Sequence, residues 1–283
     1  MDRYYILFNS TASCGKGEQL AHQLDQRLQG NLTYHDVMKV ENYAAFFHDA
    51  PSSSKVILCG GDGTLNRFVN RTRDLDLPYE IYYYAAGTGN DFLHDIEGTV
   101  GDDPIRINQY LKDLPTATVK GKEYLFINDI GFGIDGYCTM VGDEQRRQGA
   151  KKINYTTIAI GGLLGKYHPQ TAHVTVDGVN YDFENAWLAP TMKGRYYGGG
   201  MMPAPDQDRL DPEHKVTVMV YCGVNKLKTM CMFPSIFKGT HVRFTKYVTI
   251  LKGSHVHVRF DQPAPVQIDG ETIMDVLEYE VNI

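Results

Sequence analysis

The chain has 283 residues, of which 42% are hydrophobic and 22% are charged, so it can bury a core in about two domains and is neither disordered nor fibrous. Its net charge of −6 argues against nucleic acid as a partner, and no apolar run reaches the roughly 18–20 residues of a membrane span. The N-terminus has no signal-peptide pattern and the five cysteines have no CxxC spacing, so we expect a cytoplasmic protein with reduced thiols.

The first predicted strand covers residues 4–9 and runs into a loop of small residues that ends in Gly15, Lys16 and Gly17. Apolar residues at spacings of three and four then predict a helix over residues 20–28. A small-residue loop before a helix can bind phosphate through its backbone N–H groups, and an ordinary strand–helix loop is the alternative. The candidate nucleotide contacts in this loop are Asn9, Ser10, Thr11 and Ser13.

A strand over residues 32–37 and a short helix over residues 42–48 are predicted next, followed by a buried strand over residues 55–60. This strand ends in the sequence GGDGTLN, and a helix follows it. Glycines let a phosphate approach the backbone closely, whereas Asp62 needs a bridging Mg²⁺ or water beside a polyphosphate. A plain strand–turn–helix is the alternative. The candidate contacts are Gly60, Gly61, Asp62, Gly63, Thr64, Asn66 and Arg67.

A second glycine turn, with the sequence GTGNDF, follows the strand predicted over residues 81–86. In an open α/β sheet, turns behind neighbouring strands lie side by side at the carboxyl ends, where ligands bind. Gly87, Thr88 and Asn90 are therefore further candidate nucleotide contacts, and Asp91 is a second carboxylate that can organise Mg²⁺.

Together, GGDGTLN and GTGNDF resemble the diacylglycerol kinase catalytic domain family, which comprises bacterial lipid kinases related to sphingosine kinases and more distantly to NAD kinases. The resemblance implies an α/β, Rossmann-like nucleotide-binding domain of the NAD kinase type over residues 1–115. It also implies a β-rich, sandwich-like domain over residues 116–275, a C-terminal strand over residues 276–283 that packs on one of the domains, and an active site in the cleft between them. Arg67 stands where the family has Glu, and Ser10 where it has Pro.

Several elements of the second half are predicted from local patterns. A helix is expected over residues 103–111, and a strand over residues 124–130 is expected to lead into a glycine-bent turn over residues 131–136. In this stretch Asn128, Gly131, Gly133 and Asp135 match a family pattern. A long helix is expected over residues 144–164. The remaining expected elements are strands over residues 172–176, 181–189, 216–221, 248–251, 255–260 and 276–283, and a helical piece over residues 225–237.

An irregular loop is predicted over residues 196–211, because it contains three consecutive glycines and several Pro and Asp residues. Asp side chains and exposed carbonyls suit a hard divalent cation, and Asx-turns are the alternative. The resemblance implies a structural Mg²⁺ held by Asp208 and the carbonyls of Pro205 and Leu210, although Arg209 replaces the Gly that the family has after this Asp.

Asp269 and Glu271 flank a glycine at the end of a predicted strand, and an acidic turn is the simplest explanation. The family places its catalytic acid in this Asp-Gly-Glu, so we expect Asp269 as the base and Glu271 as the residue that orients the acceptor. The resemblance implies ATP-dependent, Mg²⁺-dependent phosphoryl transfer to a lipid hydroxyl, with Asp62 and Asp91 also in catalytic roles. Diacylglycerol, which would give phosphatidic acid, is the leading acceptor. A NAD kinase or a nucleotide-binding regulator without catalysis are the alternatives.

Contact with a lipid acceptor is expected to be peripheral and transient, because the sequence has no spanning helix and no lipidation signal. Four basic residues lie close together on the helix predicted over residues 144–164 and can attract an anionic bilayer, although a solvated helix face is the alternative. They are Arg146, Arg147, Lys151 and Lys152. A homodimer is left open.

Overall fold

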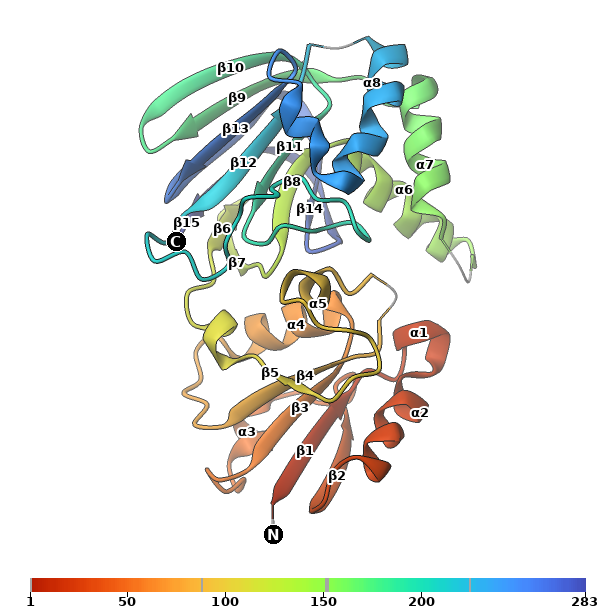
Figure 1. The fold of residues 1–283 in the computed structure, drawn as a ribbon, viewed down its shortest axis with the longest axis vertical. Helices are drawn as coiled ribbons and strands as arrows, with labels where there is room; N and C mark the ends of the chain where they lie inside the picture. Colours follow the sequence, from red (N-terminus) through yellow and green to blue (C-terminus); the bar gives the residue numbers. More distant parts are fainter. Residues whose placement is uncertain (1, 88, 151–152, 224) are drawn as a thin grey trace. The chain divides into compact units, whose positions relative to one another are not determined.

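The structure, a computed structural model, describes residues 2–87, 89–150, 153–223 and 225–283. The chain divides into two compact units, Met1–Lys112 and Asp113–Ile283, close to the boundary predicted at residue 115. The first unit is an α/β domain and the second is rich in β-strands (Figure 1), which confirms the predicted fold class. Each unit is described by itself.

The first unit is built on a five-stranded sheet with the order β2-β1-β3-β4-β5. Four strands are parallel and β5 is antiparallel to β4. The chain passes outwards from β1 to β2 and then back across β1 to β3, so the strand order reverses between β1 and β3, where open α/β sheets bind ligands. The strands are β1 (Arg3–Phe8), β2 (Asn31–Asp36), β3 (Lys55–Gly60), β4 (Glu80–Ala85) and β5 (Ile105–Arg106).

Short helices cover both faces of this sheet, which is why its central strands read as nearly continuous apolar runs. On one face, Ala21 and Leu24 pack against residues of β1 and β3. They belong to α2 (Gly17–Ala21) and the 3-10 helix η1 (His22–Gln26), so the helix predicted over residues 20–28 is shorter and less regular than expected. α3 (Tyr43–Phe47) and α4 (Asp62–Thr72) meet through aromatic rings, with the centroids of Tyr43 and Phe68 5.4 Å apart.

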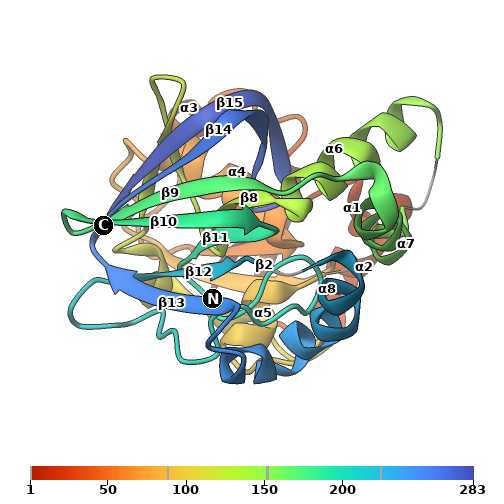
Figure 2. The ribbon, with the colours of Figure 1, turned by 90° about the horizontal axis from the view of Figure 1, so that it is seen from above.

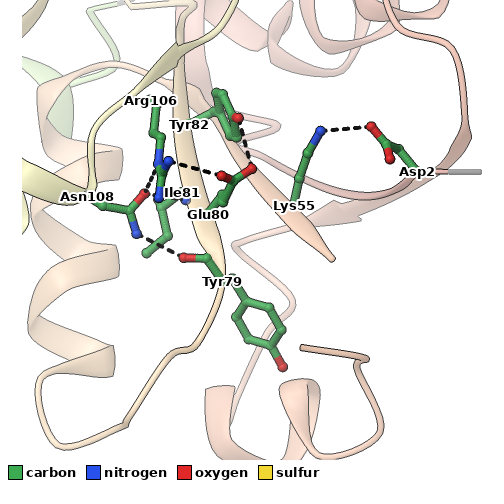
Figure 3. A network of polar contacts seen from close by, with 8 residues as sticks. All are labelled: Asp2, Lys55, Tyr79, Glu80, Ile81, Tyr82, Arg106 and Asn108. Atoms are coloured by element: carbon green, nitrogen blue, oxygen red, sulfur yellow. Dashed lines mark hydrogen bonds and ion pairs between the residues drawn. The ribbon is translucent and has the colours of Figure 1, made fainter. Parts of the chain in front are cut away.

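The helix predicted over residues 103–111 is wrong. This segment forms β5 and a 3-10 helix, η2 (Asn108–Leu111). The side chain of Asn108 accepts the N–H of Ile81 at 2.8 Å and donates to the carbonyl of Tyr79 at 2.9 Å, while Arg106 pairs with Glu80 at 3.0 Å (Figure 3). These contacts with β4 and the residue before it draw the segment onto the sheet edge, because an Asn side chain can compete with helical hydrogen bonds.

The second unit contains a ten-stranded sheet in which all the paired strands are antiparallel. The first half of the long strand β14 pairs with β9, and its second half pairs with β8. The strands are β6 (Thr116–Val119), β7 (Lys122–Leu125), β8 (Asp129–Gly133), β9 (Gln170–Val176), β10 (Val179–Ala186), β11 (Leu188–Met192), β12 (Val216–Tyr221), β13 (Val248–Gly253), β14 (His255–Ile268) and β15 (Glu271–Asn282).

The core of this sheet contains a stack of aromatic rings. The ring of Phe132 lies 4.6 Å from that of Phe260 and 5.3 Å from that of Tyr279, centroid to centroid. The predicted C-terminal strand is the end of β15, which pairs with β14 and β6.

Helices gather at one end of the strands of the second unit, and α7 and α8 lie beside each other in both views (Figures 1 and 2). Within the described residues, no helix combines the length and the apolar character needed to cross a bilayer. The helices are α6 (Ile134–Arg147), α7 (Tyr155–Gly161), the π-helical turn η3 (Gly162–Lys166), α8 (Lys226–Met232) and the 3-10 helices η4 (Phe233–Lys238) and η5 (Thr240–Arg243).

Several boundaries in the second unit differ from the predictions, and the strand predicted over residues 255–260 continues to Ile268 as β14. The strand predicted over residues 124–130 is interrupted between β7 and β8, and the one predicted over residues 181–189 changes partners between β10 and β11. The glycine-bent stretch continues β8 and then starts α6. Gly133 permits this, because its φ is 127° and a Cβ there would lie 2.4 Å from the carbonyl oxygen of Trp187. The helix predicted over residues 144–164 consists of the end of α6, then α7 and η3.

Candidate active-site residues

The two predicted glycine turns lie against each other in the first unit. A Cβ on Gly87 would lie 2.5 Å from the Cα of Gly61, so the backbones are in direct contact and a side chain does not fit. Gly63, in the first turn of α4, is different because a Cβ there would meet no atom within 4 Å. Packing therefore does not require a glycine at this position. The missing side chain leaves open space in the first turn of α4, and a helix favours an anion at its N-terminal N–H groups.

Asp62 joins the two turns. Its Oδ2 accepts the N–H of Asp91 at 3.0 Å and its Oδ1 accepts the N–H of Phe92 at 2.8 Å, at the start of α5 (Asp91–Asp95). Burial, followed by the charges of Asp62, Cys59 and Asp91, raises the pKa of Tyr83. Asp62 therefore has a structural role that the sequence analysis did not anticipate.

The loop after β1 is tied to both glycine turns. Asn9 donates to the hydroxyl of Thr64 at 3.0 Å, and its Oδ1 accepts from the N–H of Thr11 at 2.9 Å. The hydroxyl of Ser13 donates to the carbonyl of Ala86 at 2.5 Å. Since β1, β3 and β4 are neighbouring parallel strands, these three loops share the carboxyl edge of one sheet.

Most of the candidate nucleotide contacts are brought to this edge, whereas Thr88 lies outside the described residues. Asn66 is buried on α4 and accepts a hydrogen bond from Asn70 at its Oδ1. Arg67 is exposed on the same helix, 3.9 Å from the sulfur of Met38. The candidates at the edge are Asn9, Ser10, Thr11, Ser13, Gly60, Gly61, Asp62, Gly63, Thr64, Gly87, Asn90 and Asp91.

A pocket of about 510 Å³ adjoins the carboxyl ends of β1 and β2 and is lined by Phe8, Tyr34 and Asp36, among others. The Oδ1 of Asp36 accepts the N–H groups of Ser10 at 3.3 Å and Met38 at 3.1 Å. Although burial alone would raise the pKa of Asp36, hydrogen bonds from these residues lower it. The sequence analysis missed Asp36. The signal was an acidic residue at the end of the second strand, where Rossmann folds bind a ribose hydroxyl.

Asp269 and Gly270 form the two-residue turn between β14 and β15, with φ values of 45° and 86° that are typical of a type I′ hairpin. The carboxylate of Asp269 accepts three backbone N–H groups, from Ile127 at 2.7 Å, Asn128 at 2.7 Å and Asp129 at 3.0 Å. The residue is only 9% exposed. Hydrogen bonds from three amides stabilise the anion and make it a weaker proton acceptor.

Glu271, two residues later, begins β15 and is exposed. It is the partner of Ile268 in the pair that closes the hairpin, so its position follows directly from the type I′ turn. The structure thus separates the two carboxylates. Asp269 holds the backbone between β7 and β8, whereas Glu271 is accessible at the surface of the second unit.

Arg209 reaches the same break in the strand. Its buried guanidinium donates to the carbonyl of Ile127 and to the Oδ1 of Asn128. The carbonyl of Asn128 also accepts the N–H of Lys193 at 2.8 Å. Burial first, and then the charge of Arg209, lower the pKa of Lys193, which is only 3% exposed. The sequence analysis missed these two buried cations, although Arg209 was visible as a departure from the family pattern.

The loop predicted to hold a structural cation contains local turns. The Oδ1 of Asp208 accepts the N–H of Leu210 at 2.8 Å, and the Oδ1 of Asp211 accepts the N–H of Glu213 at 2.9 Å, as in Asx-turns. Among the described residues, no group of three or more His, Cys, Asp or Glu residues is arranged to hold a metal. The chemistry of the neighbouring groups also fits a divalent cation poorly, because the buried cations Arg209 and Lys193 lie close by.

The predicted basic cluster is only partly described, because Lys151 and Lys152 lie outside the described residues. Arg146 pairs with Asp143 at 2.6 Å, and Arg147 pairs with Glu144 at 2.9 Å. The charges of both arginines are therefore compensated within their own helix.

Comparisons with known proteins identify the family of the chain. The chain is 26% identical over 269 residues to a diacylglycerol kinase of Mycobacterium tuberculosis, covering 89% of this chain and 83% of that protein. It is 24% identical over 232 residues to YtlR of Bacillus subtilis, which is described as a candidate lipid kinase, covering 77% of this chain and 74% of that protein. A crystal structure from Bacillus anthracis, described as a candidate diacylglycerol kinase, has the same fold. Its TM-score is 0.69 at 17% identity, with 99% of this chain and 93% of that chain covered.

Two family descriptions match the chain in succession. The diacylglycerol kinase catalytic domain matches residues 3–119. The YegS C-terminal NAD kinase beta sandwich-like domain matches residues 128–279, which is more than half of the chain. The chain therefore belongs to the diacylglycerol kinase catalytic domain family, with a second domain of the YegS type, and is a phosphotransferase that acts on an alcohol group.

Proposed function

We propose that the protein transfers the γ-phosphate of ATP to the free hydroxyl of diacylglycerol and so produces phosphatidic acid. The observation that carries the nucleotide half is the open space at Gly63, beside two glycine turns that Asp62 fastens together. Support for diacylglycerol as acceptor comes from the Mycobacterium tuberculosis relative of that name, which matches 89% of the chain.

The triphosphate would lie over the backbone N–H groups at the start of α4, where the helix dipole favours negative charge. Asp36 would accept a ribose hydroxyl in the adjoining pocket. Its Oδ1 accepts the N–H groups of Ser10 and Met38, which holds the carboxylate in the lining of this pocket. The nucleoside end would then lie at the carboxyl ends of β1 and β2, next to the reversal of strand order between β1 and β3.

Asp62 and Asp91 fit a role beside Mg²⁺. Each oxygen of the Asp62 carboxylate accepts one backbone N–H group, so the anion is held at the junction of the two turns, and carboxylate oxygens are ligands that Mg²⁺ prefers. Mg²⁺, when bound, would supply the positive charge that lets these carboxylates lie beside a polyphosphate. Asp62 would also keep the two phosphate-binding turns in register.

The second unit would supply the general base. The sequence favoured Asp269, whereas the geometry supports Glu271, because three amide hydrogen bonds already stabilise the anionic form of Asp269. In this proposal the lipid hydroxyl transfers its proton to the Glu271 carboxylate as its oxygen bonds to phosphorus and ADP leaves. Asp269 acts as a positioning residue that shapes the backbone around the hairpin.

The test is a turnover assay with purified protein, ATP and Mg²⁺, in which diacylglycerol, phosphatidylglycerol, a long-chain alcohol and NAD are offered separately. Phosphatidic acid as the main product is the expected result. Preferential formation of NADP would identify a NAD kinase, and ATP binding without turnover on any acceptor would identify a nucleotide-binding regulator. Either result would overturn the proposal.

A further inference from the structure

Charge is unevenly distributed along the chain. Residues 145–176 and 214–260 contain 13 of the 28 Lys and Arg residues and none of the 34 Asp and Glu residues. The rest of the chain carries 15 basic and 34 acidic residues, a net charge of −19. A protein of net charge −6 therefore contains two segments that are entirely free of acidic side chains.

The two acid-free segments meet in the second unit. α7 and η3 come from the first segment, and α8 and η4 come from the second (Figures 1 and 2). η3 packs against α8, and the Nζ atom of Lys226 lies 4.0 Å from the place that a Cβ on Gly165 would occupy. A lysine of the second acid-free segment thus lies beside η3 of the first.

Large apolar side chains are exposed on the same elements. Leu164 on η3 and Leu227 on α8 are each 68% exposed, more than any other exposed large hydrophobic residue in the described part of the chain. Phe237 on η4 is also exposed. We call α7, η3, α8 and η4 the basic–apolar surface. Single exposed apolar side chains are common, but these lie on elements that pack together, η3 and α8, and an apolar patch among basic residues is typical of an interaction surface.

The positive charges of three lysines on this surface are not balanced by acidic side chains within the described residues. Within the described residues, Lys226, Lys228 and Lys238 form no ion pair with an acidic side chain, in contrast to Arg146 and Arg147. Lys228 donates to the hydroxyl of Tyr247 at 3.2 Å. The sequence Lys226, Leu227, Lys228 places an apolar side chain between two long cationic ones, an arrangement that suits a lipid headgroup layer.

We propose that the basic–apolar surface docks on an anionic phospholipid bilayer, with Leu164 and Leu227 inserted among the acyl chains and the lysines at the phosphates. This inference rests on the proposed function, because it describes how that enzyme reaches a lipid acceptor. A second copy of this chain fits less well, since a symmetric contact would bring lysines against lysines with no acidic residue between them. The bilayer supplies both the negative charge and the apolar phase.

The experiment measures sedimentation of the protein with vesicles of phosphatidylglycerol and phosphatidylcholine, without ATP or diacylglycerol. The parent is expected to bind more as the phosphatidylglycerol fraction rises and less as salt is added. The double variant Lys226→Gln/Lys228→Gln should lose about five-fold in partition coefficient per lysine. In Leu227→Ser the partition coefficient should fall on the order of tenfold, and it should fall by the same factor at high salt, because the lost contact is apolar.

The matched control is Arg146→Gln/Arg147→Gln, which removes the same total charge from arginines already paired with acids. It is expected to bind like the parent. Equal losses in the two double variants would overturn the proposal, because net charge alone would then explain binding. A second control, Val179→Ser, removes an apolar side chain that is 54% exposed on β10, outside the basic–apolar surface, and should have no effect.

Two further outcomes keep this proposal separate from the proposed function. If the parent phosphorylates a water-soluble short-chain diacylglycerol but does not bind anionic vesicles, the docking surface is wrong and the function stands. If the parent binds vesicles through this surface but phosphorylates no lipid, the docking surface stands and the function is wrong. If Leu227→Ser converts a dimer into a monomer without changing vesicle binding, a second copy covers the surface and the proposal is overturned.

Discussion

The glycine-turn edge of the first unit and the hairpin edge of the second unit hold their functional residues in opposite ways. In the first unit, the backbone is left open by glycines, and one carboxylate, that of Asp62, fastens two turns by accepting two N–H groups. In the second, buried charges clamp the backbone from both sides, with Asp269 on the N–H groups and Arg209 on a carbonyl.

The comparison shows that an aspartate in a family motif can stabilise the backbone as well as take part in catalysis. Asp62 and Asp269 were both expected to be catalytic, and both accept backbone hydrogen bonds from other segments. The two carboxylates differ in their surroundings and in how far they are buried. Asp62 lies beside the open space at Gly63, whereas Asp269 is almost buried and is followed two residues later by an exposed carboxylate, Glu271.

The largest effect is expected from Glu271→Gln, which removes the proposed base and keeps the shape of the side chain. The rate of lipid phosphorylation should fall by about 10²–10⁴-fold, as is typical for loss of a general base. Because the side chain is exposed, thermal unfolding should not change. The measurement is kcat beside a melting curve, and a variant with the parent's kcat would show that the base lies elsewhere.

Asp269→Ala should act on stability instead. Three backbone N–H groups would lose their acceptor, and each buried group left unsatisfied costs about 1–3 kcal/mol, so we expect a loss of about 3 kcal/mol or more in the free energy of unfolding. Denaturant unfolding measures this loss, with Glu271→Gln as the matched control. Equal stability of the two variants would contradict the division of roles between these carboxylates.

Asp135 is a further buried acid in the second unit, and its effect on stability should depend on pH. Burial raises its pKa to about 7, even though the N–H of Gly136 lowers it. Since the folded pKa lies above the unfolded value of about 3.9, its contribution to stability is complete below pH 4 and is lost as the pH rises to about 7. Asp135→Asn, which cannot ionise, should therefore stabilise the protein at pH 8 by as much as about 4 kcal/mol relative to pH 4.

Denaturant unfolding of parent and Asp135→Asn at pH 4, 6 and 8 measures this difference. A constant difference across the three pH values would show that Asp135 does not titrate in the folded protein over this range. Asp143→Asn is the control, because that side chain is half-buried and pairs with Arg146 at 2.6 Å.

Asp62→Asn should combine both kinds of effect. The amide nitrogen cannot accept the N–H group that one carboxylate oxygen now accepts, so we expect a loss of about 1–3 kcal/mol in stability. ATP turnover should also fall, because the charge beside the phosphates is lost. Calorimetry of ATP binding together with turnover separates the two contributions. Unchanged stability would show that the link between the turns is dispensable.

The smallest expected effect concerns the loop at Asp208. Since Arg209 and Lys193 already supply positive charge beside it, the melting temperature of the parent should be the same with Mg²⁺ and with a chelator. Asp208→Ala should differ from the parent by the same amount in both buffers. A parent that melts lower in chelator would show that a structural cation is bound after all.

Local signals predicted the first unit well. The strands and glycine turns up to residue 92 follow from apolar runs and glycines that are close in sequence, and β3 (Lys55–Gly60) contains the predicted apolar run before the first glycine turn. The helix predicted over residues 103–111 was wrong, because the side chain of Asn108 forms hydrogen bonds with Ile81 and Tyr79. Such contacts between distant residues leave no local sequence pattern.

The roles of the carboxylates could not be predicted from the sequence for the same reason. The amide of Ile127 lies 142 positions before Asp269, and the carbonyl of Ile127 lies 82 positions before Arg209. The motif Asp-Gly-Glu predicts an acidic turn, but only the antiparallel pairing of β14 with β8 shows which acid meets the backbone. The basic–apolar surface likewise depends on the contact of η3 with α8.

The most direct test of the account follows the labelled γ-phosphate of ATP in a single turnover with short-chain diacylglycerol, using the parent, Glu271→Gln and Asp62→Asn. The account predicts that the label moves to phosphatidic acid in the parent and stays in ATP in Glu271→Gln, although that variant still binds ATP. Label released as inorganic phosphate in the parent, or phosphatidic acid formed at the parent's rate by Glu271→Gln, would contradict it.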